Sequence, residues 1–446
     1  MSSLANTTLN FKSFCKINFK GGDLSSHCGL LLLGQFMENM GITSFLKKTF
    51  SDDALRQRKH NKFSIVSQLI LQKILGYCTD DAADHLAYEP IMTTVLRKDR
   101  LASQPTISRF FHDLDNGSLA DLNNVLKFIR KQSYRIQKPK EVIADIDTTI
   151  TETYGTQVGG EYIHHYQAVG YHPMLCYDGN TGDLLKAELR KGSMYCGNGA
   201  DAFMDSLLAE YAKEYPDIKV MVRGDSGFAM PDLYNTVEKY AHASYIIRLK
   251  NNAALQAKVQ GVVDAYMKDC AGKEDASPIY GEFSYAAKSW SKKRRVVYKI
   301  EIRNTEGSKE LFPTCTFIVT NRDDSPKEIV RQYCQRGNME NLIKESKNEF
   351  GIAHMCSHEQ VTNGNRLLIA GIAYHIFNLF RRLCLSEKWK AFRAGELRLR
   401  MIQIAGRHIR HAKEKHFSLC SSYAYKEQFV YALNKINSCY DILLKS

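Results

Sequence analysis

The chain lacks the features that would place it in several common classes of protein. Its 12 cysteines are irregularly spaced and include no Cys-x-x-Cys pair, so neither a zinc finger nor a disulfide framework is predicted. Reduced thiols in a cytoplasm are the simplest interpretation. We see no repeat, no low-complexity tract and no export signal, because the apolar run at residues 29–34 is too short for one. The longest apolar segment, residues 367–380, falls short of a membrane span and contains His375 and Asn378, which predicts a buried helix and no membrane partner.

The composition that is present describes a large, basic, globular chain. Its 446 residues exceed what one hydrophobic core usually organises, and 44% of them are hydrophobic and 24% charged. The net charge of +13 arises from 61 basic and 48 acidic side chains. Such an excess favours a polyanionic partner. A basic protein without such a partner has the same composition, so charge alone does not decide the function.

Hydrophobic periodicity divides the chain into segments with different predicted secondary structure. Residues 63–135 are predicted to be helical, and two short helices at 80–114 fit either a helix-turn-helix or a plain bundle. From residue 141 alternating strands, among them "EVIADIDTTI" (141–150) and "YQAVGYHPMLCYD" (166–178), are interspersed with helices at 200–214 and 231–240, an α/β layout. Residues 277–303 read as a β-hairpin with a basic centre, inserted before a further core strand at 315–322. From about residue 381 the chain is predicted to be helical and basic.

A helix is predicted to start at Ser325, an N-cap followed by proline. It carries one polar stripe, formed by Tyr333, Arg336, Glu340, Lys344 and Lys347, beside the apolar Met339, Ile343 and Phe350. Because Arg336 and Glu340 are four residues apart, a surface ladder of ion pairs would explain the stripe. Charges that border a core-facing stripe would instead need partners, a metal or a ligand.

Two strand-end carboxylates extend this pattern. Asp147 lies in "DIDTT" and Asp225 ends "VMVRGD" before a glycine turn. Each could simply cap the next turn. Together with Glu340, however, they supply the oxygen ligands that Mg²⁺ prefers, and two such ions can promote phosphoryl transfer. Asp145 shares a strand face with Asp147, so spacing alone does not choose between the two.

These residues resemble a known family. The spacing Y-x-x-R-x-x-x-E-x-x-x-x-x-x-K, matched by Tyr333, Arg336, Glu340 and Lys347, is similar to the signature of a large group of bacterial insertion-sequence transposases, the DDE enzymes. "DTT" at 147 and "RGDSGF" at 223–228 resemble the segments around the group's two catalytic aspartates. The tail "LRLRMIQIAGRHIRHAKEKHFSL" resembles the branch spelled "IS thirteen-eighty". The resemblance runs from about residue 25 to 440.

The resemblance implies a fold and an activity. The fold is α/β, a ribonuclease-H-like core with a β-rich insertion and helical N- and C-terminal domains. Asp147, Asp225 and Glu340 would bind two Mg²⁺ or Mn²⁺ ions, cut DNA at terminal inverted repeats and join the freed 3′-hydroxyl to target DNA. The partners would be double-stranded DNA and, in a homodimer, a second copy of the chain, in a bacterial cytoplasm close to the nucleoid. The residues expected to contact phosphates or bases are Tyr333, Arg336, Lys344, Lys347, Trp290, Lys292, Lys293, Arg294 and Arg295.

The predicted domains follow from this organisation. They are a helical DNA-binding domain (1–135), the first part of the core (136–250), the β-rich insertion (251–311), the second part of the core (312–385) and a basic helical domain (386–446). Two other functions fit the same residues: a nuclease on this fold without strand transfer, and a catalytically silent relative that only binds DNA. His164 and His165, with no nearby cysteine and no spaced third histidine, are interpreted as structural.

Overall fold

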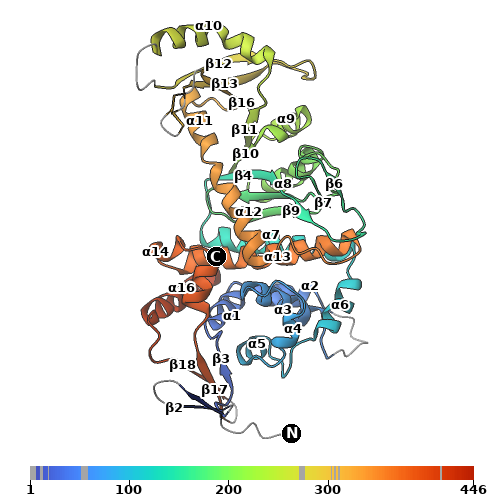
Figure 1. Cartoon of the computed structure of the whole chain (residues 1–446), viewed down its shortest axis with the longest axis vertical. Helices are drawn as coiled ribbons and strands as arrows, with labels where there is room; N and C mark the ends of the chain where they lie inside the picture. The colour runs from blue at the N-terminus through green and yellow to red at the C-terminus, as the bar shows by residue number, and fades with distance from the viewer. Residues whose placement is uncertain are drawn as a thin grey trace. The chain divides into compact units, whose positions relative to one another are not determined.

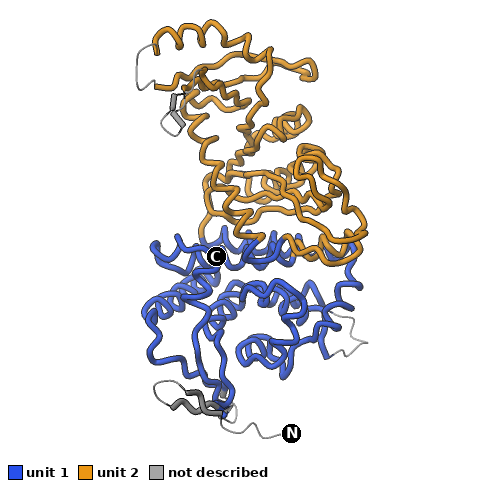
Figure 2. Tube along the Cα trace, viewed as in Figure 1, with its two compact units in different colours: residues 1–136, 348–352, 369–446 blue, residues 137–347, 353–368 orange. Residues whose placement is uncertain are grey.

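The computed structural model describes residues 7–10, 14–18, 20–51, 59–270, 277–302, 304–305, 308–309, 312–411 and 414–445. The chain forms two compact units (Figure 2). Unit 1 comprises residues 1–136, 348–352 and 369–446, and unit 2 comprises residues 137–347 and 353–368. The two ends of the chain therefore fold together in one unit, although they were predicted as separate domains.

Unit 1 is mainly helical in its N-terminal part, as the periodicity predicts. Its N-terminal elements are β1 (Thr7–Asn10), β2 (Phe14–Ile17), β3 (Leu24–Ser25), α1 (Leu30–Asn39), α2 (Ile42–Thr49), α3 (Lys62–Ile74), α4 (Ala82–His85), α5 (Pro90–Val95), α6 (Gln104–His112) and α7 (Asn116–Ile136). Its later elements are α14 (Glu387–Lys390), α15 (Ala394–Leu397), the π-helix η2 (Arg398–Ile402), β17 (Gly406–His411), β18 (Glu414–Leu419) and α16 (Lys426–Lys445).

The β17–β18 hairpin corrects the prediction that the C-terminal region is wholly helical. The two strands pair antiparallel from Gly406↔Leu419 to His411↔Glu414. β17 also pairs with β3, where Gly406 lies opposite Ser25. β17 is thus stabilised by a strand that lies almost 400 residues away in sequence. A contact of this kind cannot be predicted from the local periodicity of the sequence.

Helix α13 (Gln360–Cys384) begins in unit 2 and ends in unit 1. It is the one helix among the described residues that is long and apolar enough to cross a membrane, and 83% of its most apolar window is buried in the structure. The apolar segment thus lies in a longer helix than the sequence suggested. Such burial is typical of a core helix.

Unit 2 is built on an eight-stranded mixed sheet in the order β12-β13-β16-β11-β10-β4-β8-β9 (Figure 1). The strands are β4 (Glu141–Thr148), β8 (Met174–Asp178), β9 (Leu184–Glu188), β10 (Lys219–Gly224), β11 (Ala243–Leu249), β12 (Ile279–Tyr285), β13 (Arg294–Glu301) and β16 (Thr314–Thr320). β4, β10 and β11 are parallel neighbours, whereas β4, β8 and β9 are antiparallel. The order and direction of the five strands β9-β8-β4-β10-β11 are consistent with the ribonuclease-H-like core that the resemblance implied. The predicted helices at 200–214 and 231–240 are confirmed as α8 (Ala200–Glu214) and α9 (Pro231–Glu238).

The predicted insertion is not a separate body. Its first part is a helix, α10 (Ala253–Cys270), and its hairpin β12–β13 extends the main sheet. β13 pairs with β16 over seven positions, from Arg295↔Thr320 to Glu301↔Thr314. A further short pair, β14 (Asn304–Thr305) with β15 (Ser308–Lys309), follows it. Residues 271–276, 303, 306–307 and 310–311 of the predicted insertion lie outside the described residues.

One strand predicted at 166–178 is divided into two. Its first half, β7 (Ala168–Tyr171), belongs to a small separate sheet with β5 (Thr151–Glu152) and β6 (Glu161–Ile163), in the order β5-β7-β6. Gly170 lies in the middle of this sheet, where a Cβ would come within 2.4 Å of the Thr151 carbonyl oxygen. The small sheet is inserted between β4 and β8, and the sequence had not predicted it.

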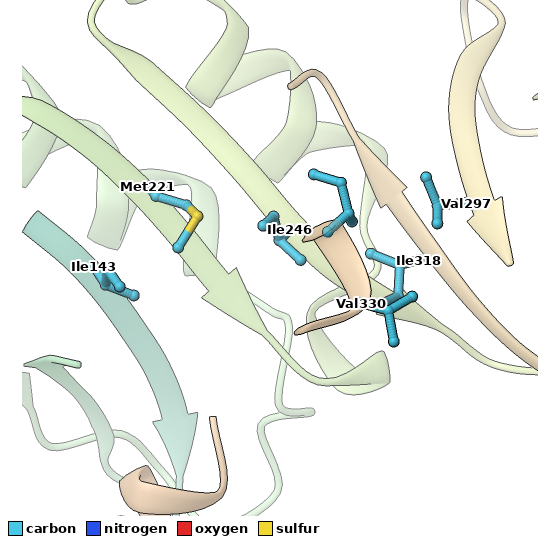
Figure 3. Close-up of a cluster of buried hydrophobic side chains, with 7 residues drawn as sticks. Ile143, Met221, Ile246, Val297, Ile318 and Val330 are labelled. Atoms are coloured by element: carbon cyan, nitrogen blue, oxygen red, sulfur yellow. The ribbon is translucent and has the colours of Figure 1, made fainter. Parts of the chain in front are cut away.

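A hydrophobic cluster fixes helix α11 (Pro326–Cys334) on one face of the main sheet. It contains Ile143, Met221, Ile246, Val297 and Ile318 from five strands, together with Ile329 and Val330 from α11 (Figure 3). The helix begins as predicted, because the Ser325 side chain accepts a hydrogen bond from the Glu328 amide and Pro326 occupies the first turn. Buried apolar side chains of this kind contribute about 1.5–3 kcal/mol each.

The prediction of one continuous helix through the polar stripe is wrong. α11 ends at Cys334 and α12 (Gly337–Phe350) begins three residues later. At the break, the Arg336 amide donates to the Tyr333 carbonyl at 3.0 Å, three residues back, as in a tight turn. Gly337 follows this turn, and its missing side chain favours such a break. Arg336 therefore lies between two helices.

Candidate active site

The register of three parallel strands aligns the predicted polar residues at one edge of the sheet. Asp145 of β4 lies opposite Arg223 of β10, which lies opposite Ile246 of β11. Extending this register by two residues places Asp147, Asp225, which directly follows β10, and Arg248 in a second row. Side chains two positions apart share a face of a sheet, so this second row lies on the face that α11 covers. The carboxyl ends of β4, β10 and β11 thus present two acids and one base side by side.

The first row is a closed, buried ion pair. Arg223 donates to both carboxylate oxygens of Asp145, at 2.5 Å and 2.6 Å, and each side chain is only 1% exposed. A third donor of Arg223 reaches the Gln332 carbonyl oxygen in α11. A Cβ on Gly179 would lie 2.5 Å from Asp145 Oδ2, so glycine is needed beside the pair. The charge of Asp145 is therefore compensated by Arg223 inside the protein. This contact distinguishes Asp145 from Asp147, which sequence spacing could not do.

The second row is open and only partly compensated. Asp147 Oδ2 lies 2.9 Å from Arg336 Nη2, and their side chains are 22% and 17% exposed. Burial raises the pKa of Asp147, the charge of Arg336 lowers it, and the charge of Asp225 raises it again. Burial lowers the pKa of Arg336, but the charges of Asp147 and Asp225 outweigh this effect and raise it. Asp147 is thus paired with Arg336, and Asp225 lies close enough to influence the pKa of both groups.

Two more predicted residues, Lys347 and Tyr333, border the same edge. Lys347 Nζ donates to the Ile150 carbonyl at 2.8 Å and contacts Thr149 Oγ1 at 3.3 Å, just beyond Asp147. Burial lowers the pKa of Lys347. Tyr333 packs partly against the hydrophobic cluster. Burial raises its pKa, while the nearby charges of Arg336 and Arg248 lower it.

Glu340 is not brought to the two aspartates. Its carboxylate is paired with Lys344 at 2.7 Å, and the two side chains are 73% and 61% exposed. This hydrogen bond from Lys344 lowers the pKa of Glu340. At about 100° per residue, Glu340 and Lys347 share one face of α12, so Glu340 points to the side on which Lys347 meets the end of β4. Among the described residues no group of three His, Cys, Asp or Glu side chains is close enough to hold a metal ion.

The residues at the strand ends nevertheless fit a divalent cation. Asp147 Oδ1 accepts a hydrogen bond from the Thr148 amide and Asp225 Oδ1 accepts one from the Gly227 amide, both at 2.8 Å. These bonds orient each carboxylate. Carboxylate oxygens are the ligands that Mg²⁺ and Mn²⁺ accept. Asp147 and Asp225 are the two carboxylates at this edge that would hold such a cation.

The basic hairpin is engaged in contacts within the protein. Arg294 is buried, donates to Glu238 at 2.9 Å and to Asn235 at 2.6 Å, and stacks near Tyr234 and Trp290. Trp290 packs edge-on against Tyr234 and Tyr285. Arg295 donates to Glu282 and to the carbonyl oxygens of Arg322 and Asp324. Lys292 is exposed and pairs with Glu238 at 3.0 Å, and Lys293 is exposed. Of the five predicted contacts, the two lysines are the side chains that the fold leaves at the surface.

Sequence reasoning missed two residues at the edge. Arg248 is the last residue but one of β11, and the Arg-Leu-Lys end of that strand was the available signal. Burial and the charges of Asp147, Cys196 and Asp225 raise the pKa of Tyr166 to about 12. Tyr166 lies in the turn between β6 and β7, a turn that the alternation of the sequence did not indicate.

Comparison with known proteins assigns the chain to a family. The sequence profile described as "Transposase DDE domain group 1" matches residues 8–440. A structure of the piggyBac transposase synaptic complex with hairpin DNA is 13% identical, covers 79% of this chain and 74% of its own, and gives a TM-score of 0.41. The Mos1 transposase paired-end complex with the left transposon end is 11% identical, covers 51% and 75%, and gives a TM-score of 0.17.

Both TM-scores are below 0.5, so neither likeness assigns a residue or a partner to this chain. No curated protein matches the chain in sequence. The family profile, in contrast, covers nearly the whole sequence and includes both strand-end aspartates, Arg336 and Glu340. The chain belongs to the DDE transposase domain family, group 1.

Proposed function

We propose that this protein is a metal-dependent DNA transposase of a bacterial insertion sequence. It would cut element ends at terminal inverted repeats and join the 3′-hydroxyl to target DNA. The proposal is carried by Asp147, Asp225 and Arg248, which fall in one row when the register of β4, β10 and β11 is extended by two residues, together with the ion pair of Arg336 and Asp147. Facing carboxylates beside several cations suit a phosphodiester, because the acids attract a divalent cation and the bases hold phosphate oxygens.

The residues divide between two tasks. Asp147 and Asp225, completed by Glu340, would hold two Mg²⁺ or Mn²⁺ ions, which when bound activate the attacking oxygen and stabilise the leaving oxygen. Arg336 and Lys347 would hold the phosphates on either side of the scissile bond. Arg336 Nε is buried and has no hydrogen-bond partner among the described residues, and a phosphate oxygen would satisfy this donor. Arg248 and Tyr333 would orient the same strand from β11 and α11.

Glu340 would join the site by exchanging one partner for another. Its bond to Lys344 is exposed, and exposed ion pairs contribute only about 0–1 kcal/mol. Breaking this ion pair therefore costs little. Lys344, freed at the same time, would be available to a phosphate.

The finer features of the proposal rest on the sequence resemblance. They are membership of the "IS thirteen-eighty" branch, a ribonuclease-H-like core, double-stranded DNA as substrate, a homodimer that pairs two element ends, and a place in the bacterial cytoplasm near the nucleoid. The excess of basic over acidic side chains suits a DNA partner. The sheet order β9-β8-β4-β10-β11 supports the core assignment.

A cleavage assay tests the proposal. Purified full-length protein would be incubated with labelled DNA that carries the inverted repeats flanking its gene, with Mg²⁺ or with chelator. We expect Mg²⁺-dependent cutting at the repeat boundary by the wild type and no cutting by Asp225→Ala or Glu340→Ala. Asp217→Asn is the matched control, because Asp217 is an exposed acid of the same unit whose side chain pairs with exposed Lys138. Undiminished cutting by Asp225→Ala would refute the assignment of the site.

The assay also separates the two alternative functions. Specific binding without cutting would favour a catalytically silent relative. The separation of Glu340 from the two aspartates supports this alternative. Cut ends that never join target DNA would favour a nuclease. Joined products, lost in Glu340→Ala, would support the transposase.

A further inference from the structure

A group of aromatic side chains lies exposed beside the candidate site and has no part in the proposed chemistry. Tyr162, His164, His165 and Tyr166 occupy the tip of the β6–β7 hairpin, and Tyr195 lies in the loop before α8; we call these five residues the aromatic rim. Tyr162 is 49% exposed, Tyr166 38% and Tyr195 54%, and both histidines are exposed. Large aromatic side chains gathered at a surface commonly mark a binding site.

The rim is held rigidly as one surface. The Ser193 amide donates to Glu161 Oε2 at 3.1 Å, which connects the hairpin to the loop that carries Tyr195. A Cβ on Gly192 would lie 2.2 Å from the Gly170 carbonyl oxygen and 2.5 Å from that of Glu161, so loop and hairpin are in direct backbone contact. The ring centroids of His172 and Tyr166 are 6.0 Å apart, and His172 Nδ1 is hydrogen-bonded to the Met194 carbonyl oxygen at 2.8 Å.

The rim adjoins the strand ends that bear the carboxylates. The Cβ of Cys196 would lie 3.0 Å from a Cβ on Gly227, and a Cβ on Gly197 would lie 2.6 Å from the Gly227 carbonyl oxygen. The loop of Tyr195 is thus packed on the turn that follows Asp225. Besides burial, the charges of Asp147 and Asp225 raise the pKa of Tyr166, as expected for a hydroxyl near these two carboxylates. A strand whose phosphate lies at the carboxylates therefore has the rim as its next neighbour.

The orientation of the rings restricts what they can bind. Their mutual contacts are edge-on, with interplanar angles of 89° for Tyr162–His164, 78° for His165–Tyr166 and 81° for Tyr166–His172. Rings that meet edge-on cannot cover one another's faces fully, so flat groups can still stack on them. In a paired duplex the faces of the bases are occupied by their neighbours, and only unpaired bases have faces available for stacking.

We propose that the aromatic rim binds unpaired nucleotides of the DNA strand next to the scissile phosphodiester. The inference rests on the proposed function, because it takes the phosphodiester to lie at Asp147 and Asp225. Stacking of one base on an aromatic side chain contributes about 1–3 kcal/mol. The rim would thus favour a strand end that is locally unpaired at the cut over a fully paired one.

The test compares two DNA probes with the full-length protein in Ca²⁺, which we expect to support binding without cutting. One probe is a labelled duplex with a single-stranded fork at one end, and the other is the same duplex fully paired. We expect Tyr166→Ala to weaken binding of the fork about 5- to 100-fold and that of the paired duplex less than about twofold. Tyr166→Trp should retain the preference, since it keeps a ring for stacking. Phe312→Ala is the control, because Phe312 is 78% exposed, belongs to unit 2 like the rim, and is part of neither the rim nor the candidate site.

The possible outcomes separate the inference from the proposed function. An equal loss for both probes, or no loss for the fork, would overturn the inference. A change in oligomeric state by light scattering, with fork binding intact, would overturn it in favour of a contact between copies of the chain. Failure of the wild type to bind either probe would overturn the proposed function as well. A wild type that binds and cuts, beside a Tyr166→Ala variant that keeps its preference, would overturn the inference alone.

Discussion

The buried pair of Arg223 and Asp145 allows a quantitative prediction. Substituting Arg223 by methionine removes the cation but keeps an unbranched side chain of similar length. The variant loses two hydrogen bonds to Asp145 and one to the Gln332 carbonyl oxygen. Asp145, 1% exposed, then remains as a buried carboxylate without its partner. We expect the unfolding free energy of unit 2 to fall by about 3–5 kcal/mol, the typical cost of breaking a buried ion pair from one side.

A second substitution tests the cause of this loss. In the Arg223→Met background, Asp145→Asn replaces the unpaired carboxylate by a neutral amide of the same shape. If the cost arises from the buried charge, the double variant should regain about 1–3 kcal/mol. Lys138→Met is the surface control, since Lys138 and Asp217 are 52% and 81% exposed and such a pair contributes about 0–1 kcal/mol.

The measurement can be made unit-specific. The chain has two tryptophans, of which Trp290 lies in unit 2 and Trp389 in unit 1. In a Trp389→Phe background, urea unfolding followed by Trp290 fluorescence reports on unit 2, which matters because a chain with two units need not unfold in one step. A loss below about 1 kcal/mol for Arg223→Met, or a further loss on adding Asp145→Asn, would refute the reasoning.

Three other predictions concern the edge of the sheet and its surroundings. Arg336→Gln removes the guanidinium that lies 2.9 Å from Asp147, so Mn²⁺ binding without DNA, followed by electron paramagnetic resonance, should tighten about tenfold; weaker binding would show that Arg336 supports the site instead. Lys347→Gln should weaken DNA binding and reduce the slope of its salt dependence by about one unit, and an unchanged slope would exclude a phosphate contact. Burial raises the pKa of Asp178 to about 6. The folded state therefore binds the proton more tightly than the unfolded state does. As pH rises from about 4 to above 6, the unfolding free energy should fall by on the order of 3 kcal/mol at most. Urea titrations of the wild type and Asp178→Asn measure this fall, and a rise over that range would contradict it.

Local features of the fold were predictable because their causes lie within a few residues. The N-cap of α11 follows from Ser325 and Pro326, and its hydrogen bond to the Glu328 amide spans three positions. Helix α8 follows from periodicity, and its predicted bounds at 200–214 are those of the structure. The alternation in "EVIADIDTTI" predicts strand β4. The motif spacing around Arg336 and Glu340 indicated the family that the profile match establishes.

The sequence did not predict which strand a segment would join. The β12–β13 hairpin has the composition of an insertion, but β13 pairs with β16 and thereby extends the main sheet. Likewise, "YQAVGYHPMLCYD" alternates as one strand, yet β7 and β8 join different sheets. Pairing of this kind is set by packing against distant strands, which propensity does not encode.

The sequence by itself determined the residue types of the candidate site and their approximate places on strand ends and a helix. Only the tertiary structure decided how their charges are distributed. Asp145 and Asp147 share a strand face in sequence, but Arg223, 78 residues away, pairs with the first and leaves the second at the edge. The break at Gly337 turns Arg336 toward Asp147 and leaves Glu340 with Lys344. The physical reason is that charge compensation and register depend on which distant groups come within a few ångströms of each other, and a linear pattern cannot fix those distances.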